Sequence, residues 1–143
     1  MANIISDPVT TNDATAKYQV GKIYEFNGNL YRYVQSLEAL AAGVPCEYGD
    51  ATMTGVYKAA NGSSKGRKCA GIALLTTTIN YYCFLQCSGI ASIVTDGNVV
   101  AGDFIKTGTA AGVRDTSTLS IDFAFAPADD VSTTGTVYLF GIV

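Results

Sequence analysis

Residues 22–34 read Lys22-Ile23-Tyr24-Glu25-Phe26-Asn27-Gly28-Asn29-Leu30-Tyr31-Arg32-Tyr33-Val34, and they give the clearest indication of the fold class. Aromatic and aliphatic residues flank the dipeptide Asn27-Gly28, which is typical of a type I′ hairpin loop because both loop positions need φ > 0. With this loop, Tyr24 lies opposite Tyr31. Glu25 and Arg32 fall on a diagonal of the other face, where they can form an ion pair.

The hairpin carries four aromatic residues on one face: Tyr24, Phe26, Tyr31 and Tyr33. Such a face can bind a sugar or single-stranded nucleic acid by stacking. More often it is part of the core, and this is the interpretation we favour. Exposed Tyr24 and Tyr31 would indicate a binding face, whereas buried ones would indicate core.

Strands are also expected along the rest of the chain, at 46–48, 71–75, 81–87, 89–94, 104–105, 119–126 and 136–143. Larger apolar residues alternate with small or polar ones through 119–126, which indicates a half-buried strand, whereas 81–87 and 136–143 are apolar on both faces and indicate central strands. The Gly-, Ala-, Thr- and Ser-rich stretch 107–118 is expected to be a loop. The pattern predicts an all-β fold, a single-domain β-barrel or β-sandwich.

The chain divides into an N-terminal arm, residues 1–17, and a β domain, residues 18–143. A chain of 143 residues fits one domain. After Ile5 the first 17 residues contain almost no large apolar residue, so they favour an extended arm over a packed element. The arm is either a frayed terminus or a segment that orders on a neighbouring molecule through Ile4, Ile5 and Val9.

Composition excludes several function classes. The net charge is −3, whereas proteins that bind nucleic acid usually carry a stripe of basic residues. The longest apolar run is far shorter than the ~20 residues of a membrane-spanning helix. The first residues lack the basic start and apolar stretch of a signal peptide, so synthesis in the cytoplasm is expected. We expect neither nucleic acid nor membrane as a partner.

Catalytic and metal chemistry have few side chains to use. The chain has no histidine, which removes the Ser–His and Cys–His arrangements and the usual zinc ligand sets. No run of acids fits a calcium loop. The four cysteines are expected to be buried free thiols that pack as small apolar side chains: Cys46, Cys69, Cys83 and Cys87. The sequence therefore predicts no enzyme activity, no cofactor and no metal site.

A basic Gly/Ser loop at 61–68 carries Lys65, Arg67 and Lys68. It does not have the G-x-x-x-x-G-K-[ST] order of a phosphate-binding loop. A cluster of this kind is usually a solvated loop tip. The alternative is that it docks on an acidic patch of a protein partner.

The sequence resembles the small capsid decoration (cement) proteins of tailed bacteriophages. The resemblance covers roughly 18–143 and is carried by a Gly-rich, charge-poor β composition together with four stretches: Tyr31-Arg32-Tyr33-Val34 followed by 39–43, Ala70-Gly71-Ile72-Ala73, Ser88-Gly89-Ile90-Ala91 followed by 98–106, and the ending 124–143.

This resemblance implies a virion protein, commonly a homotrimer, on the outer capsid surface. Its partner is the major capsid protein, and its role is to stabilise the shell without chemistry. The capsid contacts expected under this hypothesis are Ile4, Ile5 and Val9 of the arm, with Lys65, Arg67 and Lys68 as a secondary contact. Two alternatives remain: a phage tail or fibre component, and a β-barrel module that binds a small apolar ligand in a large closed pocket.

Overall fold

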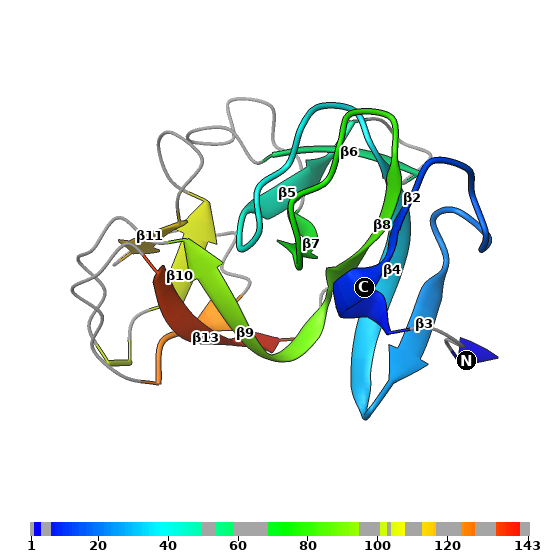
Figure 1. Cartoon of the computed structure of the whole chain (residues 1–143). Helices are drawn as coiled ribbons and strands as arrows, with labels where there is room; N and C mark the ends of the chain where they lie inside the picture. The colour runs from blue at the N-terminus through cyan, green and yellow to red at the C-terminus, as the bar shows by residue number, and fades with distance from the viewer. Residues whose placement is uncertain are drawn as a thin grey trace.

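The computed structural model describes residues 2–3, 7–49, 54–58, 69–94, 101–102, 104–107, 113–116, 124–127 and 134–140. Its elements in chain order are β1 (Ala2–Asn3), the 3-10 turn η1 (Pro8–Thr10), β2 (Asn12–Asp13), β3 (Ile23–Phe26), β4 (Asn29–Ser36), β5 (Pro45–Tyr48), β6 (Gly55–Lys58), β7 (Cys69–Ala73), β8 (Tyr82–Gln86), β9 (Ser88–Val94), β10 (Phe104–Thr107), β11 (Val113–Thr116), β12 (Ala124–Phe125) and β13 (Thr134–Phe140). Figure 1 shows two groups of strands, joined where β8 continues into β9. Among the described residues, no helix is long and apolar enough to cross a membrane.

Five strands close into a barrel in the order β4-β6-β5-β7-β8, because β8 pairs back onto β4. The β4–β6 pairing is parallel, and the other pairings of the ring are antiparallel. Side chains from these strands and the adjoining loop fill the barrel as one cluster: Val34, Leu40, Cys46, Val56, Ala70, Ala73, Cys83 and Leu85. The barrel interior is thus a packed core of the protein's own side chains.

Strands β1, β2 and β3 extend the sheet of the barrel, and the last five strands form a second sheet in the order β11-β10-β12-β13-β9. Its inner face packs against Ile72 of the barrel in a second core cluster, made of Ile72, Ala91, Ile93, Ala124, Ala126, Val137 and Leu139. Strand β13 lies between β12 and β9, which confirms the prediction of a central strand near the C-terminus. The architecture confirms the predicted all-β, single-domain fold, and of the two predicted alternatives, β-barrel and β-sandwich, it has the barrel.

The hairpin of β3 and β4 has the predicted loop and register. Asn27 and Gly28 have φ values of 48° and 81°, as a type I′ turn requires, and Tyr24 pairs with Tyr31. Tyr24 and Tyr31 are each only 6% exposed, and both belong to an aromatic core cluster with Tyr33 and Phe84. The aromatic face is therefore core, as favoured, and offers no stacking platform to a sugar or nucleic acid.

Three details of the sequence-based prediction are wrong. Arg32 forms no ion pair with Glu25: its Nη1 donates to the carbonyl of Gly21 at 2.6 Å. Strand β11 lies within the expected loop 107–118, because its main chain pairs with β10 along four residues. Strand β6 was missed, since its four residues carry too short a pattern. Of the expected strand 119–126, only residues 124–126 are described, and β12 covers the first two of them.

Candidate interaction surface

The N-terminal segment from Asp7 onward is fastened to the barrel. Strand β2 pairs with β8, Asn12 opposite Cys83 and Asp13 opposite Tyr82. The sequence predicts an extended arm over residues 1–17. The described residues of this stretch pair with the protein's own sheet, through β2 on β8 and through β1 on β3. The boundary between arm and domain at residues 17 and 18 stays a prediction.

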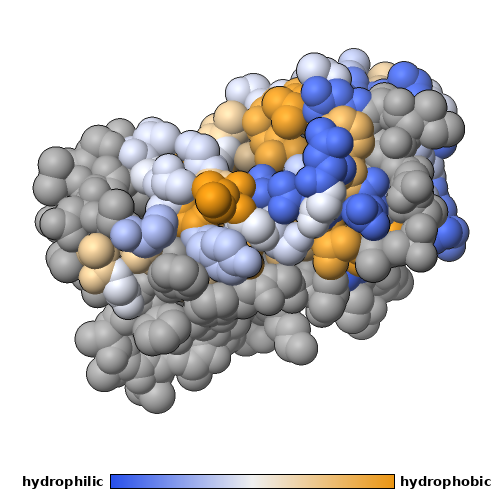
Figure 2. Space-filling view, turned by 90° about the horizontal axis from the view of Figure 1, so that it is seen from below, coloured by the Kyte–Doolittle hydropathy of each residue, from blue (hydrophilic) through white to orange (hydrophobic). Residues whose placement is uncertain are grey.

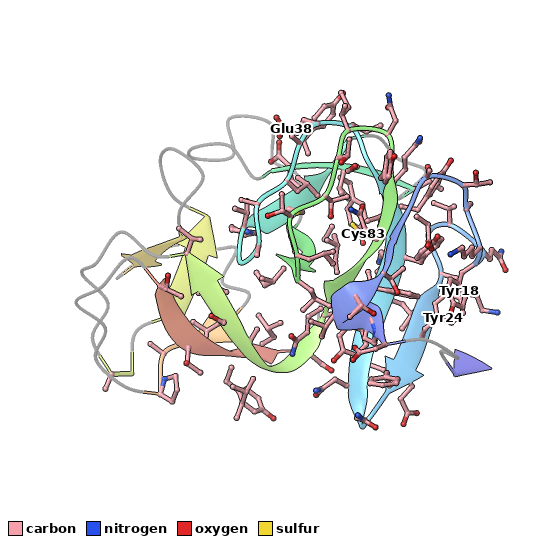
Figure 3. All side chains as sticks on the ribbon, in the orientation of Figure 1. Tyr18, Tyr24, Glu38 and Cys83 are labelled. Carbon is pink, nitrogen blue, oxygen red and sulfur yellow. The ribbon has the colours of Figure 1, made fainter. Side chains whose placement is uncertain are left out.

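A buried polar network holds this segment in place. The Tyr33 hydroxyl donates to Oδ2 of Asp13 at 2.8 Å and accepts the main-chain N–H of Lys17 at 3.2 Å. Lys17 Nζ lies 2.9 Å from Oδ1 of the same Asp13. Burial, assisted by the bond to Asp13, raises the pKa of Tyr33 far above its usual range, so the hydroxyl stays a proton donor. Tyr18 packs edge-on against Tyr24, 5.4 Å away, on the outer side of the hairpin (Figure 3).

Only one of the expected capsid-contact residues has a described side chain. Val9 lies on η1 with 51% of its surface exposed. Its N–H is held by Oδ1 of Asp7 at 2.9 Å, which caps the turn. The other five expected contacts lie outside the described residues: Ile4, Ile5, Lys65, Arg67 and Lys68. The arm and basic-loop contacts therefore stay predictions.

The outer face of β9 and β13 carries the most exposed apolar side chain among the described residues. Ile90 is 66% exposed, and Tyr138, directly opposite it, is 47% exposed. The next pair along this face, Ser92 and Thr136, is polar, uncharged and exposed. Figure 2 views the molecule from below relative to Figure 1, and it shows apolar residues in separate groups among hydrophilic ones. Sequence reasoning missed this face because it treated 136–143 as apolar on both sides.

A groove of about 380 Å³ opens beside β9. It is lined by Ala42, Gly43, Ala73, Leu74, Ser92, Ile93, Val94 and Thr134. These residues come from the barrel and from the second sheet, and none of them carries a charge. The groove is therefore a largely apolar depression where the two halves of the fold meet.

Gly43 shapes one wall of this groove. Its N–H donates to the carbonyl of Ala73 at 2.8 Å, and its carbonyl accepts the N–H of Val94 at 2.9 Å, so it bridges the barrel to β9. Its φ is +81°, and a Cβ there would lie 3.3 Å from both Cγ2 and N of Val94. The position thus needs glycine for its backbone conformation and for the close approach.

The thiols are structural. Cys46, Cys83 and Cys87 are free and buried, which confirms the prediction for these three, and Figure 3 shows Cys83 inside the barrel. The side chain of Cys69 lies outside the described part of the structure. Burial raises the pKa of Cys83 to about 11 and that of Cys87 to about 12. A protonated, enclosed thiol is a poor nucleophile. Within the described ranges, no group of three or more His, Cys, Asp or Glu could hold a metal ion.

Comparison with known proteins gives a likeness of fold. The sequence matches no protein-family model and no curated protein. The structure is similar to the crystal structure of the N base of head fibre gp8.5 from bacteriophage phi29, with a TM-score of 0.59. The alignment covers 78% of this chain and 93% of that one at 13% sequence identity. At that identity the comparison establishes a shared fold.

Proposed function

We propose that this chain is a structural protein of a phage virion that binds the outer surface of the head and stabilises it as a decoration (cement) protein. The observation that carries the proposal is the fold shared with the base of a phage head fibre over most of both chains. The sequence resemblance to phage decoration proteins points to the same part of a virion. The partner is the major capsid protein, and the protein acts as a homotrimer on the capsid surface after synthesis in the host cytoplasm.

The physical basis of this role is differential binding. A protein that binds the assembled shell better than its separated subunits stabilises the shell by mass action. Many copies on a symmetric lattice add weak contacts into a large total, and several contacts per oligomer increase its avidity. This role needs contact surface and no catalytic group, which fits the buried, protonated thiols and the exposed uncharged face of β9 and β13.

A fibre component is the second candidate. It is favoured by the fold neighbour itself, which is the base of a head fibre. A fibre component would also bind the head, but it would carry a further part that extends away from the capsid. Because the aromatic face of the hairpin is buried in the core, a fibre component would have to bind a host glycan through another surface.

Co-sedimentation with purified phage heads that lack this protein tests the proposal. Light scattering first gives the oligomeric state, for which a trimer is expected. The trimer should then pellet with the heads and saturate at a fixed copy number per shell. A protein that stays in the supernatant at every concentration would contradict head binding.

Val9 and Ile79 form a matched pair for locating the contact. Their side chains are exposed to nearly the same extent, 51% and 50%. Val9→Asp places a charge in the expected capsid contact and should weaken pelleting, whereas Ile79→Asp places the same charge elsewhere and should not. Equal loss with both variants would argue against a contact centred on η1.

A further inference from the structure

Strand β9 has one edge that none of the described strands pairs with. On that edge, the carbonyl of Ile90 accepts the side-chain amide of Gln86 at 2.8 Å, and the N–H of Val94 donates to Gly43 at 2.9 Å. Main-chain groups of alternate residues point to the same side of a strand. The N–H and carbonyl of Ser92, midway between the two, therefore point outward as well, and neither has a partner among the described residues.

The two neighbouring contacts limit what can pair there. In an antiparallel pair of β9 edges centred on Ser92, Ile90 of one copy would face Val94 of the other. Both residues already use an outward main-chain group, Ile90 for Gln86 and Val94 for Gly43. Covering an edge in this way is how natural sheets avoid joining edge to edge. We call the outward N–H and carbonyl of Ser92, which have no partner among the described residues, the Ser92 opening. It can thus pair with a single extended segment but not with β9 of a second copy.

The groove lies directly beside this opening. Ser92 lines it together with Leu74 and Val94, and its volume of about 380 Å³ is in the lower range of pockets that bind small ligands. Since none of the described residues that line it is charged, the groove suits an uncharged, apolar side chain. Ile90, 66% exposed on the same face of β9, extends the apolar contact along the strand.

We propose that the Ser92 opening and its groove receive an extended, uncharged segment of the major capsid protein, which adds beside β9 as a short strand. The segment exchanges two main-chain hydrogen bonds with Ser92 and places an apolar side chain between Leu74 and Val94. This is strand addition, in which the main chain supplies affinity and the pocket supplies selectivity. The inference rests on the proposed function, because it takes the capsid protein as the partner.

Ser92→Pro tests the hydrogen bonds. Proline removes the Ser92 N–H, and since that group points away from β13, the ladder between β9 and β13 is retained. Binding to purified heads that lack the protein should weaken by about tenfold or more. Ser92→Ala keeps the main-chain N–H and serves as the matched control, with affinity within about twofold of wild type.

Ala42→Trp tests the groove without touching β9. Ala42 is exposed and lines the groove, so a tryptophan there can occupy the space without displacing core. It should weaken binding to the heads as Ser92→Pro does. Circular dichroism and thermal melting establish that each variant is folded, and Ala42→Trp decides the question if Ser92→Pro does not fold.

The outcomes separate the two proposals. Wild-type protein that fails to bind heads overturns both head binding and the Ser92 site. Wild-type binding that neither variant weakens overturns the Ser92 site and leaves the proposed function standing. A photo-crosslinking amino acid at position 42 gives a second readout on assembled heads. A cross-link to the capsid protein is expected, whereas a cross-link only to another copy of this chain overturns the assignment of the partner.

Discussion

Tyr33→Phe should release the fastening of the N-terminal segment while leaving the aromatic core filled. The ring is fully buried, so phenylalanine keeps its packing. The hydroxyl, however, donates to the Asp13 carboxylate at 2.8 Å and accepts the N–H of Lys17 at 3.2 Å. A hydrogen bond to a charged group contributes about 1.5–3 kcal/mol and a neutral one about 0.5–1.5 kcal/mol. Because water can reach the exposed Lys17, we expect a net loss of about 2–3 kcal/mol.

Equilibrium urea unfolding followed by circular dichroism measures this loss. For a chain of this size it corresponds to a fall in Tm of roughly 5–10 °C. Tyr82→Phe is the matched control, because Tyr82 stacks on Tyr33 with ring centroids 6.0 Å apart. Its hydroxyl makes no hydrogen bond to the described residues of the N-terminal segment, so this variant should lose little unfolding free energy. Equal destabilisation by the two variants would refute the assignment of anchoring to the Tyr33–Asp13 bond.

Three further predictions concern stability and the thiols. Gly43→Ala should destabilise the protein more than Gly102→Ala. Both positions have a positive φ, at which alanine costs about 1–2 kcal/mol, but only at Gly43 does the new Cβ also contact Val94. Equal losses of unfolding free energy in urea would contradict this. Because burial raises the folded-state pKa of Cys83 and Cys87 to about 11 and about 12, their stabilising effect is complete below the unfolded thiol pKa, and the unfolding free energy should fall as pH rises from about 9 toward 12; replacing both by alanine should flatten that fall. A thiol reagent at pH 8 should modify Cys83 and Cys87 only as fast as the protein opens, and immediate modification in native buffer would show that they are accessible.

Local signals in the sequence account for much of the fold. The Asn27-Gly28 loop fixes the hairpin register by itself, because a two-residue type I′ turn leaves one possible pairing. Short strands are harder to find. Strands β11 and β6 are held in strand conformation by pairing with β10 and β5. Each has four residues of mixed polarity, and that is too short a pattern to identify a strand from the sequence.

The candidate surface was less accessible to sequence reasoning. Ile90 and Tyr138 meet only because β9 and β13, far apart in the chain, pair in register. The alternation of Ile90 with Ala91 and Ile93 was a usable signal, since it places Ile90 on the face opposite the core. The groove depends on Gly43 bridging two strands, and no local pattern encodes that contact.

Reconstruction of phage heads with and without this protein would show whether it binds the head. We expect additional density on the outer surface of the head, repeated by the capsid symmetry, large enough for this β domain and in contact with the major capsid protein. Identical heads, or density found only on the tail, would overturn the proposed function.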